Sequence, residues 1–191
     1  IGVLLNAFFE ISAQRDDIDL HIVGQGPMYP QIQRLCGPRV SAPGWLQGDE
    51  LRHAYAQADI FAFPSITETF GNVVLEAMSC GLPVVVMNGG GAREVPRDGV
   101  DGFIARGRED FTVCLQRLVD DPELRQAMGS NARASALTRT WEREFDRLVL
   151  LYKECALAHS PRAPTLPPAM HRLRSLTRAI GQVALPRHLG I

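Results

Sequence analysis

Apolar residues along this chain follow two kinds of spacing, which mark out the expected elements. Short continuous apolar runs predict buried strands, and recurrence at intervals of three and four residues predicts amphipathic helices. The expected strands are IDLHIVG, RVSAPGWL, DIFAFPS, LPVVVMN and GFIA. The expected helices cover residues 1–14, 27–36, 48–58, 70–81, 92–99, 108–119, 122–137 and 141–157.

The order of these elements predicts the fold class. Strands and helices alternate, the connections are too long for hairpins, and the strands are too apolar for a sheet with one face in water. The sequence therefore predicts an α/β domain with a doubly wound parallel sheet. Such sheets bind ligands beyond the carboxyl ends of their strands, where three glycine-containing turns are expected here: GQGP, SITETFGN and NGGGA.

These turns indicate an anionic, phosphorylated ligand, although two of them also have plainer explanations. GQGP lacks a third glycine three positions after Gly26, where Tyr29 stands, so a tight turn explains it better than a dinucleotide fingerprint. NGGGA leaves bare backbone amides ahead of a helix, and a flexible turn accounts for it equally well. No single turn is therefore enough to identify the ligand.

Glu68 has two interpretations. Ser65 and Glu68 have the spacing of a capping box, in which each side chain bonds the other residue's backbone amide at the start of a helix. Gly71 would then fall in the first helical turns and cost about 1 kcal/mol relative to Ala. The alternative is a helix that begins near Phe70 and directs the amides of Phe70, Gly71 and Asn72 at a ligand.

Glu76 is the only charged residue between Thr69 and Ala92, and its apolar surroundings predict that it is buried. A buried carboxylate is costly unless strong donors meet it. The donor is either an Arg or Lys elsewhere in the chain or the hydroxyl groups of a ligand, since paired hydroxyls match the two carboxylate oxygens. Phosphates at the helix end and hydroxyls at the carboxylates together describe a nucleotide sugar.

The motifs around these two glutamates resemble a known family. FPSITETFGNVVLEAMSCGLPVVV, with LHIVGQGP and GWLQGDELRHAYAQADIFAFPS before it and GGGAREVPRDGVDGFIA after it, resembles the carboxyl-terminal lobe of retaining GT-B glycosyltransferases, glycosyltransferase family 4. The resemblance runs from about Gly2 to Tyr152 and is most specific from Asp59 to Val95. It implies a Rossmann-like lobe that holds a nucleotide-diphosphate sugar, and sugar transfer with retained configuration and no metal ion or other cofactor.

The resemblance also implies roles for particular residues. Glu68 would be catalytic, because it would bond the donor sugar's hydroxyls and help stabilise positive charge at the anomeric carbon. Glu76 would hold the ribose hydroxyls. The remaining donor-binding residues would be Gly24, Gly26, Phe70, Gly71, Asn72, Val73 and Glu94, with Glu94 on the base side of the site.

Some parts of the family pattern are not found in this sequence. In the family, a strand, a Gly-Arg turn and a Lys precede the helix that opens this chain, and an amino-terminal lobe faces the donor lobe across a cleft. The chain begins at Ile1 within an amphipathic pattern, so we expect it to be a piece of a longer protein. We also expect it to bind donor weakly and to transfer little or nothing alone.

Composition and residue spacing indicate which classes of protein and which binding partners to expect. The chain has 191 residues, of which 46% are hydrophobic and 21% charged, as in ordinary soluble globular proteins. No apolar run reaches the roughly 18 residues that span a bilayer, and the four cysteines and five histidines show no metal-ligand spacing. We expect a cytoplasmic protein with reduced cysteines and no metal, and no nucleic-acid partner.

The last part of the chain differs from the rest in charge. Residues 1–154 contain 15 of the 20 Lys and Arg residues and all 21 Asp and Glu residues, so the tail is basic and the body acidic. We expect the donor lobe at residues 1–157 and a Pro-rich linker with an amphipathic helix at residues 158–191. The helix, at residues 169–185, would bind either an anionic membrane surface or the amino-terminal lobe.

The predicted function is therefore that of a donor-binding domain of a hexosyltransferase, with GDP-mannose or a UDP-hexose as donor and a glycan, lipid or other acceptor. One alternative is a noncatalytic nucleotide-sugar-binding module that needs a partner lobe. A second is a GT-B epimerase, which would turn over nucleotide sugars without an acceptor.

Overall fold

The computed structural model of the protein describes residues 1–158. The chain divides into two compact units, Ile1–Thr140 and Trp141–Ile191. The first unit contains all the described strands. The expected boundary at residue 157 and the lobe it delimits stay predictions, and the expected tail helix at residues 169–185 lies outside the described residues.

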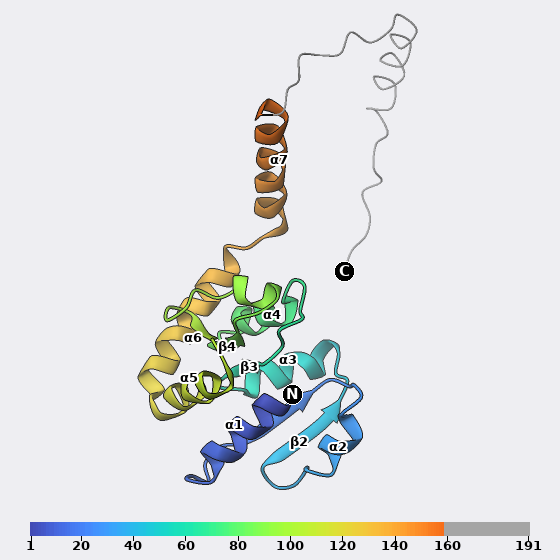
Figure 1. The fold of residues 1–191 in the computed structure, drawn as a ribbon, viewed down its shortest axis with the longest axis vertical. Helices are drawn as coiled ribbons and strands as arrows, with labels where there is room; N and C mark the ends of the chain where they lie inside the picture. Colours follow the sequence, from blue (N-terminus) through green and yellow to red (C-terminus); the bar gives the residue numbers. More distant parts are fainter. Residues whose placement is uncertain (159–191) are drawn as a thin grey trace, which may run out of the picture. The chain divides into compact units, whose positions relative to one another are not determined.

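The structure contains every strand that the apolar runs predicted and a helix in each predicted position (Figure 1). The elements are α1 (Gly2–Ser12), β1 (Leu20–Val23), α2 (Tyr29–Gln33), β2 (Val40–Gly44), α3 (Gly48–Gln57), β3 (Phe61–Phe63), α4 (Asn72–Ser79), β4 (Val84–Met87), η1 (Gly91–Glu94), β5 (Gly102–Ala105), α5 (Arg108–Asp120), α6 (Pro122–Leu137) and α7 (Trp141–Ala158). The element η1 is a single 3₁₀ turn, shorter than the helix expected there.

All the strand pairs in the described residues are parallel, which confirms the predicted strand direction. The hydrogen bonds run in two sets: β1 pairs with β2, and β4 lies between β3 and β5. In the larger set, Phe61 lies opposite Val84 and Val84 opposite Gly102. The sheet is therefore divided into a two-stranded part and a three-stranded part.

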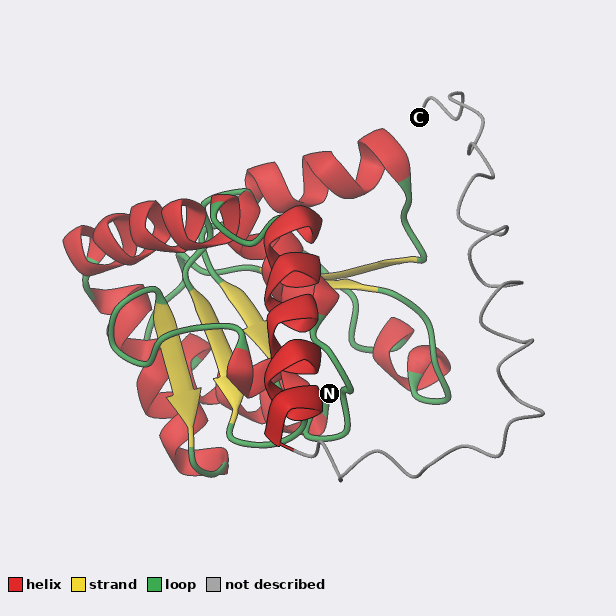
Figure 2. Cartoon of the chain, turned by 90° about the horizontal axis from the view of Figure 1, so that it is seen from above, coloured by secondary structure: helices red, strands yellow, loops and turns green. Residues whose placement is uncertain are grey.

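Helices cover both faces of the three-stranded part, as a doubly wound fold requires (Figure 2). Successive side chains of a strand point to opposite faces, so Val85 lies on one face and Val84 and Val86 on the other. Val85 packs in a cluster with residues of α1, α5 and α6, and Val84 and Val86 pack with residues of α4 and α6. All three valines are fully buried.

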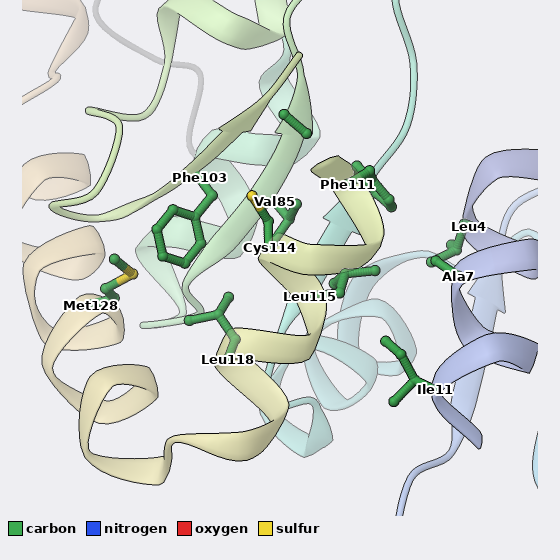
Figure 3. Close-up of a cluster of buried hydrophobic side chains, with 11 residues drawn as sticks. Leu4, Ala7, Ile11, Val85, Phe103, Phe111, Cys114, Leu115, Leu118 and Met128 are labelled. Atoms are coloured by element: carbon green, nitrogen blue, oxygen red, sulfur yellow. The ribbon is translucent and has the colours of Figure 1, made fainter. Parts of the chain in front are cut away.

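The helix α1 joins the two parts of the sheet. Its residues Leu4, Ala7 and Ile11 face the α5 residues of the first cluster (Figure 3). Its residues Leu5 and Phe8 pack instead in a third cluster with β1, α2 and β2. Because its apolar positions cover a wide stripe, one helix contributes to both cores.

A buried carboxylate fastens the segment before β5 to α6. Asp101 is fully buried and accepts hydrogen bonds from the backbone amide of Arg97 at 2.5 Å and from the Arg97 guanidinium at 2.8 Å. The hydroxyl of Ser135 on α6 donates to the same carboxylate at 2.7 Å. These donors compensate for the lost hydration of the charge. The sequence did not single out Asp101.

Candidate active site

The loop before α4 and the glycine turn after β4 form the centre of the candidate site. They follow neighbouring parallel strands, since Phe63 of β3 lies opposite Val86 of β4. The Gly91 amide donates to the carbonyl oxygen of Glu68 at 2.5 Å. A Cβ at Gly90 would lie 2.5 Å from the same oxygen, and a Cβ at Gly91 would collide with the Thr69 carbonyl. The glycines thus let two backbones touch, which a flexible turn would not require.

Glu68 occupies two of the three amides that the sequence assigned to a ligand, those of Phe70 and Gly71 but not that of Asn72. One oxygen of its carboxylate accepts from the backbone amides of Thr69 at 3.1 Å, Phe70 at 3.4 Å and Gly71 at 3.5 Å. The amides therefore converge on a negative charge, as the anion-binding interpretation requires. A carboxylate of the chain itself fills the position.

The helix α4 begins at Asn72, two residues later than expected. Ser65 lies seven residues before that point, so it does not cap the helix and the capping-box interpretation is wrong. Gly71 precedes the helix with φ of 82°, a left-handed conformation that favours glycine. A Cβ there would lie 2.9 Å from the Cα of Ala92. The group that approaches this glycine closely is η1.

The expectation that Glu76 is buried is wrong, because the residue is exposed. The buried face of α4 consists of Val74, Ala77 and Met78, and Glu76 lies on another face. With 3.6 residues per turn, Asn72 and Val73 lie one turn before Glu76 on that face. Apolar neighbours in sequence did not imply burial, since they point in different directions around the helix.

A tyrosine meets the Glu76 carboxylate, and no Arg or Lys is needed to explain it. The Tyr55 hydroxyl, on α3, donates to Oε2 of Glu76 at 3.1 Å and lies 3.5 Å from the carbonyl oxygen of Val73. Burial of the phenol, followed by the negative charge of Glu76, raises the pKa of Tyr55 well above its usual range. The hydroxyl therefore remains a donor at any physiological pH.

Glu94 is the last residue of η1, the 3₁₀ turn that begins at the last of the three glycines. Its carboxylate accepts from the Arg93 guanidinium at 2.8 Å, and its backbone carbonyl accepts from Arg139 at 3.3 Å. Arg93 also donates to the side chain of Asn88 at 3.4 Å. Arg93 is the only Lys or Arg from Asp59 to Pro96, and this isolation is the sequence feature that distinguishes it.

Gly24 and Gly26 belong to the two-stranded part of the sheet. The Gly24 amide donates to the Gly44 carbonyl at 2.7 Å, and the Tyr29 amide donates to the Gly26 carbonyl three residues earlier, as in a β-turn. A Cβ at either glycine would meet no atom within 4 Å. Within residues 1–158, no hydrogen bond links this turn to the Glu68 loop.

The structure thus brings most of the predicted residues together and leaves Gly24 and Gly26 apart from them. Glu68, Phe70, Gly71 and Glu94 belong to the touching loops, and Asn72, Val73 and Glu76 continue from them along α4. This surface is open, since the Phe70 side chain is 57% exposed. Two cavities of about 820 and 760 Å³ lie elsewhere, one beside α1 and α5 and one between β2 and α3, and neither is lined by Glu68 or Glu76.

The described residues offer neither a metal-ligand cluster nor a membrane-spanning helix. Within residues 1–158, no group of three or more His, Cys, Asp or Glu side chains is placed to hold a metal ion. None of the helices in that range has the length and apolar character needed to cross a bilayer. The expected cytoplasmic location and the expected membrane contact of the tail stay predictions.

An α/β lobe with parallel strands, a loop of converging backbone amides and an exposed carboxylate on the next helix fits the glycosyltransferase class that the sequence motifs resemble. The family model described as glycosyl transferases group 1 matches residues 1–121, more than half of the chain. The chain belongs to this family. Its fold is one lobe of a GT-B glycosyltransferase, which confirms the resemblance seen in the sequence.

Three known proteins illustrate the similarity. Sulfoquinovosyl transferase SQD2 of Arabidopsis thaliana is 42% identical over 125 residues, which make up 62% of this chain and 24% of that protein. Anabaena Alr3699/HepE, solved in complex with UDP and glucose, has 25% identity and a TM-score of 0.62 over 78% of this chain and 44% of that one. The C-terminal domain of the Francisella tularensis group 1 protein LpcC shares the fold, with 19% identity and a TM-score of 0.63 over 72% of this chain and 77% of that one.

The coverage of these relatives differs in a consistent way. This chain spans about a quarter of the length of SQD2 and less than half of HepE, whereas it covers most of the isolated LpcC domain. The matched region therefore corresponds to one lobe of a larger transferase.

Proposed function

We propose that this chain is the donor-binding lobe of a retaining hexosyltransferase that transfers a hexose from a UDP-hexose or GDP-mannose to a glycan, lipid or other acceptor. The observation that carries the proposal is the arrangement at the start of α4. Three backbone amides converge on one carboxylate oxygen there, and the exposed carboxylate of Glu76 follows one turn later.

The amides at the start of α4 are suited to the diphosphate of the donor. Donors that bind a carboxylate oxygen can bind a phosphate oxygen with the same geometry. On donor binding, Glu68 would exchange these amides for the hydroxyls of the donor sugar. Its charge would then help stabilise positive charge at the anomeric carbon while the amides stabilise the leaving diphosphate, the kind of electrostatic effect that dominates many enzymes.

Glu76 would bind the two ribose hydroxyls of the nucleotide, because a carboxylate accepts two parallel hydrogen bonds. Gly24 and Gly26 would allow the nucleotide to approach the backbone, since the space beside both is open. Arg93 adds a positive charge beside the glycine turn. Its guanidinium pairs with the exposed carboxylate of Glu94, so it can turn toward an anion at little cost.

The complex of HepE with UDP and glucose supports a UDP-hexose as the first donor to test. Following the family resemblance, we also propose that transfer needs no metal ion, with the amides and cationic side chains neutralising the diphosphate. Transfer by the complete enzyme should then persist in EDTA, and loss of activity that Mg²⁺ or Mn²⁺ restores would contradict this part of the proposal.

A thermal-shift titration tests donor binding by the chain. A ligand at ten times its Kd stabilises the folded state by about 1.4 kcal/mol, so UDP, GDP, ADP and their hexose derivatives at millimolar concentration should differ measurably in the Tm they produce. Glu76→Ala should abolish the largest shift. Glu109→Ala, which removes the same charge from the start of α5, should leave it unchanged.

Turnover separates the enzyme from a noncatalytic binding module. The chain alone should hydrolyse or transfer little or no donor sugar, because the amino-terminal lobe supplies much of the acceptor site. Appreciable transfer by the chain alone would contradict this expectation. Binding that is never accompanied by transfer, even with the amino-terminal lobe present, would favour a noncatalytic binding module.

A further inference from the structure

Tyr55 donates a hydrogen bond from its side chain to the Glu76 carboxylate. Its ring is half buried and packs at the edge of the cluster that contains Val74, Met78 and Ala136. The ring centroid lies 5.9 Å from that of Phe61, at an interplanar angle of 52°. The hydroxyl emerges from this apolar setting and reaches Glu76, which is 21 residues further along the chain.

We propose that Tyr55 is a positioning residue of the donor site, which fixes the Glu76 carboxylate through one lone pair of Oε2 and leaves the remaining lone pairs of its two oxygens for the vicinal hydroxyls of a ribose. This inference rests on the proposed function. An exposed glutamate side chain otherwise samples several rotamers, and each must be given up when a ligand binds. A hydrogen bond from a packed ring removes that freedom in advance.

Two features of the contact support positioning over simple packing. The hydroxyl donates to Oε2 at 3.1 Å, so it selects one carboxylate orientation. The Tyr55 ring is held by the packing described above, whereas the Glu76 side chain lies on the exposed face of α4. The rigid partner therefore orders the flexible one, and the raised pKa of Tyr55 keeps the donor proton in place.

The test compares ribose recognition in four forms of the chain. Binding of UDP and 2′-deoxy-UDP is measured by calorimetry for the wild type, Tyr55→Phe, Glu76→Gln and the double variant, with GDP and 2′-deoxy-GDP as the second pair. We expect the wild type to prefer the ribonucleotide and Glu76→Gln to lose that preference. Tyr55→Phe should reduce the preference by about threefold to tenfold, the range of one net hydrogen bond. The double variant should bind no worse than Glu76→Gln.

Tyr29→Phe is the matched control. It removes a hydroxyl that donates to the Ala42 carbonyl at 3.1 Å in the two-stranded part of the sheet, so it should leave the preference unchanged. A Tyr55 with a purely structural role would lower the Tm on substitution and weaken ribo- and deoxynucleotides equally.

The outcomes distinguish the inference from the function on which it rests. If Tyr55→Phe leaves the preference intact while Glu76→Gln abolishes it, the role of Tyr55 is overturned and the donor site stands. If Glu76→Gln also leaves it intact, or if the wild type binds neither nucleotide pair, both proposals are overturned.

Discussion

The two parts of the divided sheet differ in burial, most clearly between β4 and β1. In the three-stranded part, Val84, Val85 and Val86 of β4 are fully buried. In the two-stranded part, Ile22 is the buried residue of β1 and Val23 is 39% exposed. The helix α4 buries Val74, Ala77 and Met78, whereas α2, which packs on the two-stranded part, buries Ile32 alone.

The number of neighbours explains this difference. β4 has a strand on each side and helices on both faces, so each side chain loses contact with water. Within the described residues, β1 has a strand on one side and an apolar cluster on one face. Hydrophobic stabilisation follows the area removed from water. The three-stranded part should therefore carry most of the stability, and it also holds the Glu68 loop.

Truncating matched methionines should give the largest contrast between the two parts. Met78→Ala opens a cavity in a fully buried cluster and should lower the free energy of unfolding by about 2–5 kcal/mol. Met28→Ala, at a side chain that is 40% exposed before α2, should change it by less than about 0.5 kcal/mol. Urea denaturation measures both, and equal losses would mean that the two parts are equally packed.

Removing the buried carboxylate should have the next largest effect. Asp101→Ala leaves the donors of Arg97 and Ser135 without their acceptor. Because the Arg97 side chain is largely exposed and can be rehydrated, we expect a loss of about 2 kcal/mol rather than the larger values of fully buried pairs. Asp17→Ala breaks an exposed pair with Arg15 and serves as the control. A Tm no lower for Asp101→Ala than for this control would refute the structural role.

Adding a methyl group at the glycine turn tests the contact between the two loops. Gly91→Ala places a Cβ against the Thr69 carbonyl and should cost about 1–3 kcal/mol as the loops move apart. Gly26→Ala, where the Cβ meets no atom within 4 Å, should have little effect on the Tm. If both variants melt at the wild-type temperature, the loops do not pack as described.

The two parts should also differ in cysteine chemistry. Burial, followed by the charge of Asp110, raises the pKa of Cys114 from its ordinary value near 9 to about 11. Cys36, in the two-stranded part, is exposed. Because the thiolate is the reactive form, two pKa units alone should slow the reaction of Cys114 with a disulfide reagent about 100-fold at pH 8. Mass spectrometry of the labelled chain gives the two rates, with comparable rates as the contrary result.

The same pKa predicts a direction for stability against pH. The folded-state pKa of Cys114 lies above that of the unfolded thiol. The contribution of the protonated Cys114 to the free energy of unfolding is therefore fully present below pH 9 and is lost as the pH rises toward 11. Stability of the wild type should therefore fall over that range more steeply than that of Cys114→Ala.

The sequence predicted elements best where a local pattern decides the conformation. The three valines of β4 are β-branched and consecutive, and they formed a strand as expected. Glu68 and Gly71 lie in the loop before α4, near the helix start that the sequence indicated, and their roles in donor binding stay predictions. The expected burial of Glu76 was wrong because a run of apolar residues does not say which way each side chain points, and its role in ribose binding stays a prediction. Tyr55 was missed because its partner Glu76 lies 21 residues away, and Asp101 because its bond to α6 comes from Ser135, 34 residues away.

The amino-acid sequence by itself determined the alternation of strands and helices, the parallel class of fold and the short segment in which the candidate site lies. Those properties depend on spacing and backbone preference within a few residues. Only the tertiary structure decided that the sheet divides in two, that the Glu68 carboxylate binds the backbone amides of the residues after it, and that a tyrosine hydroxyl bonds Glu76. These contacts arise when distant segments pack together, and burial and hydrogen bonding depend on which neighbours that packing supplies.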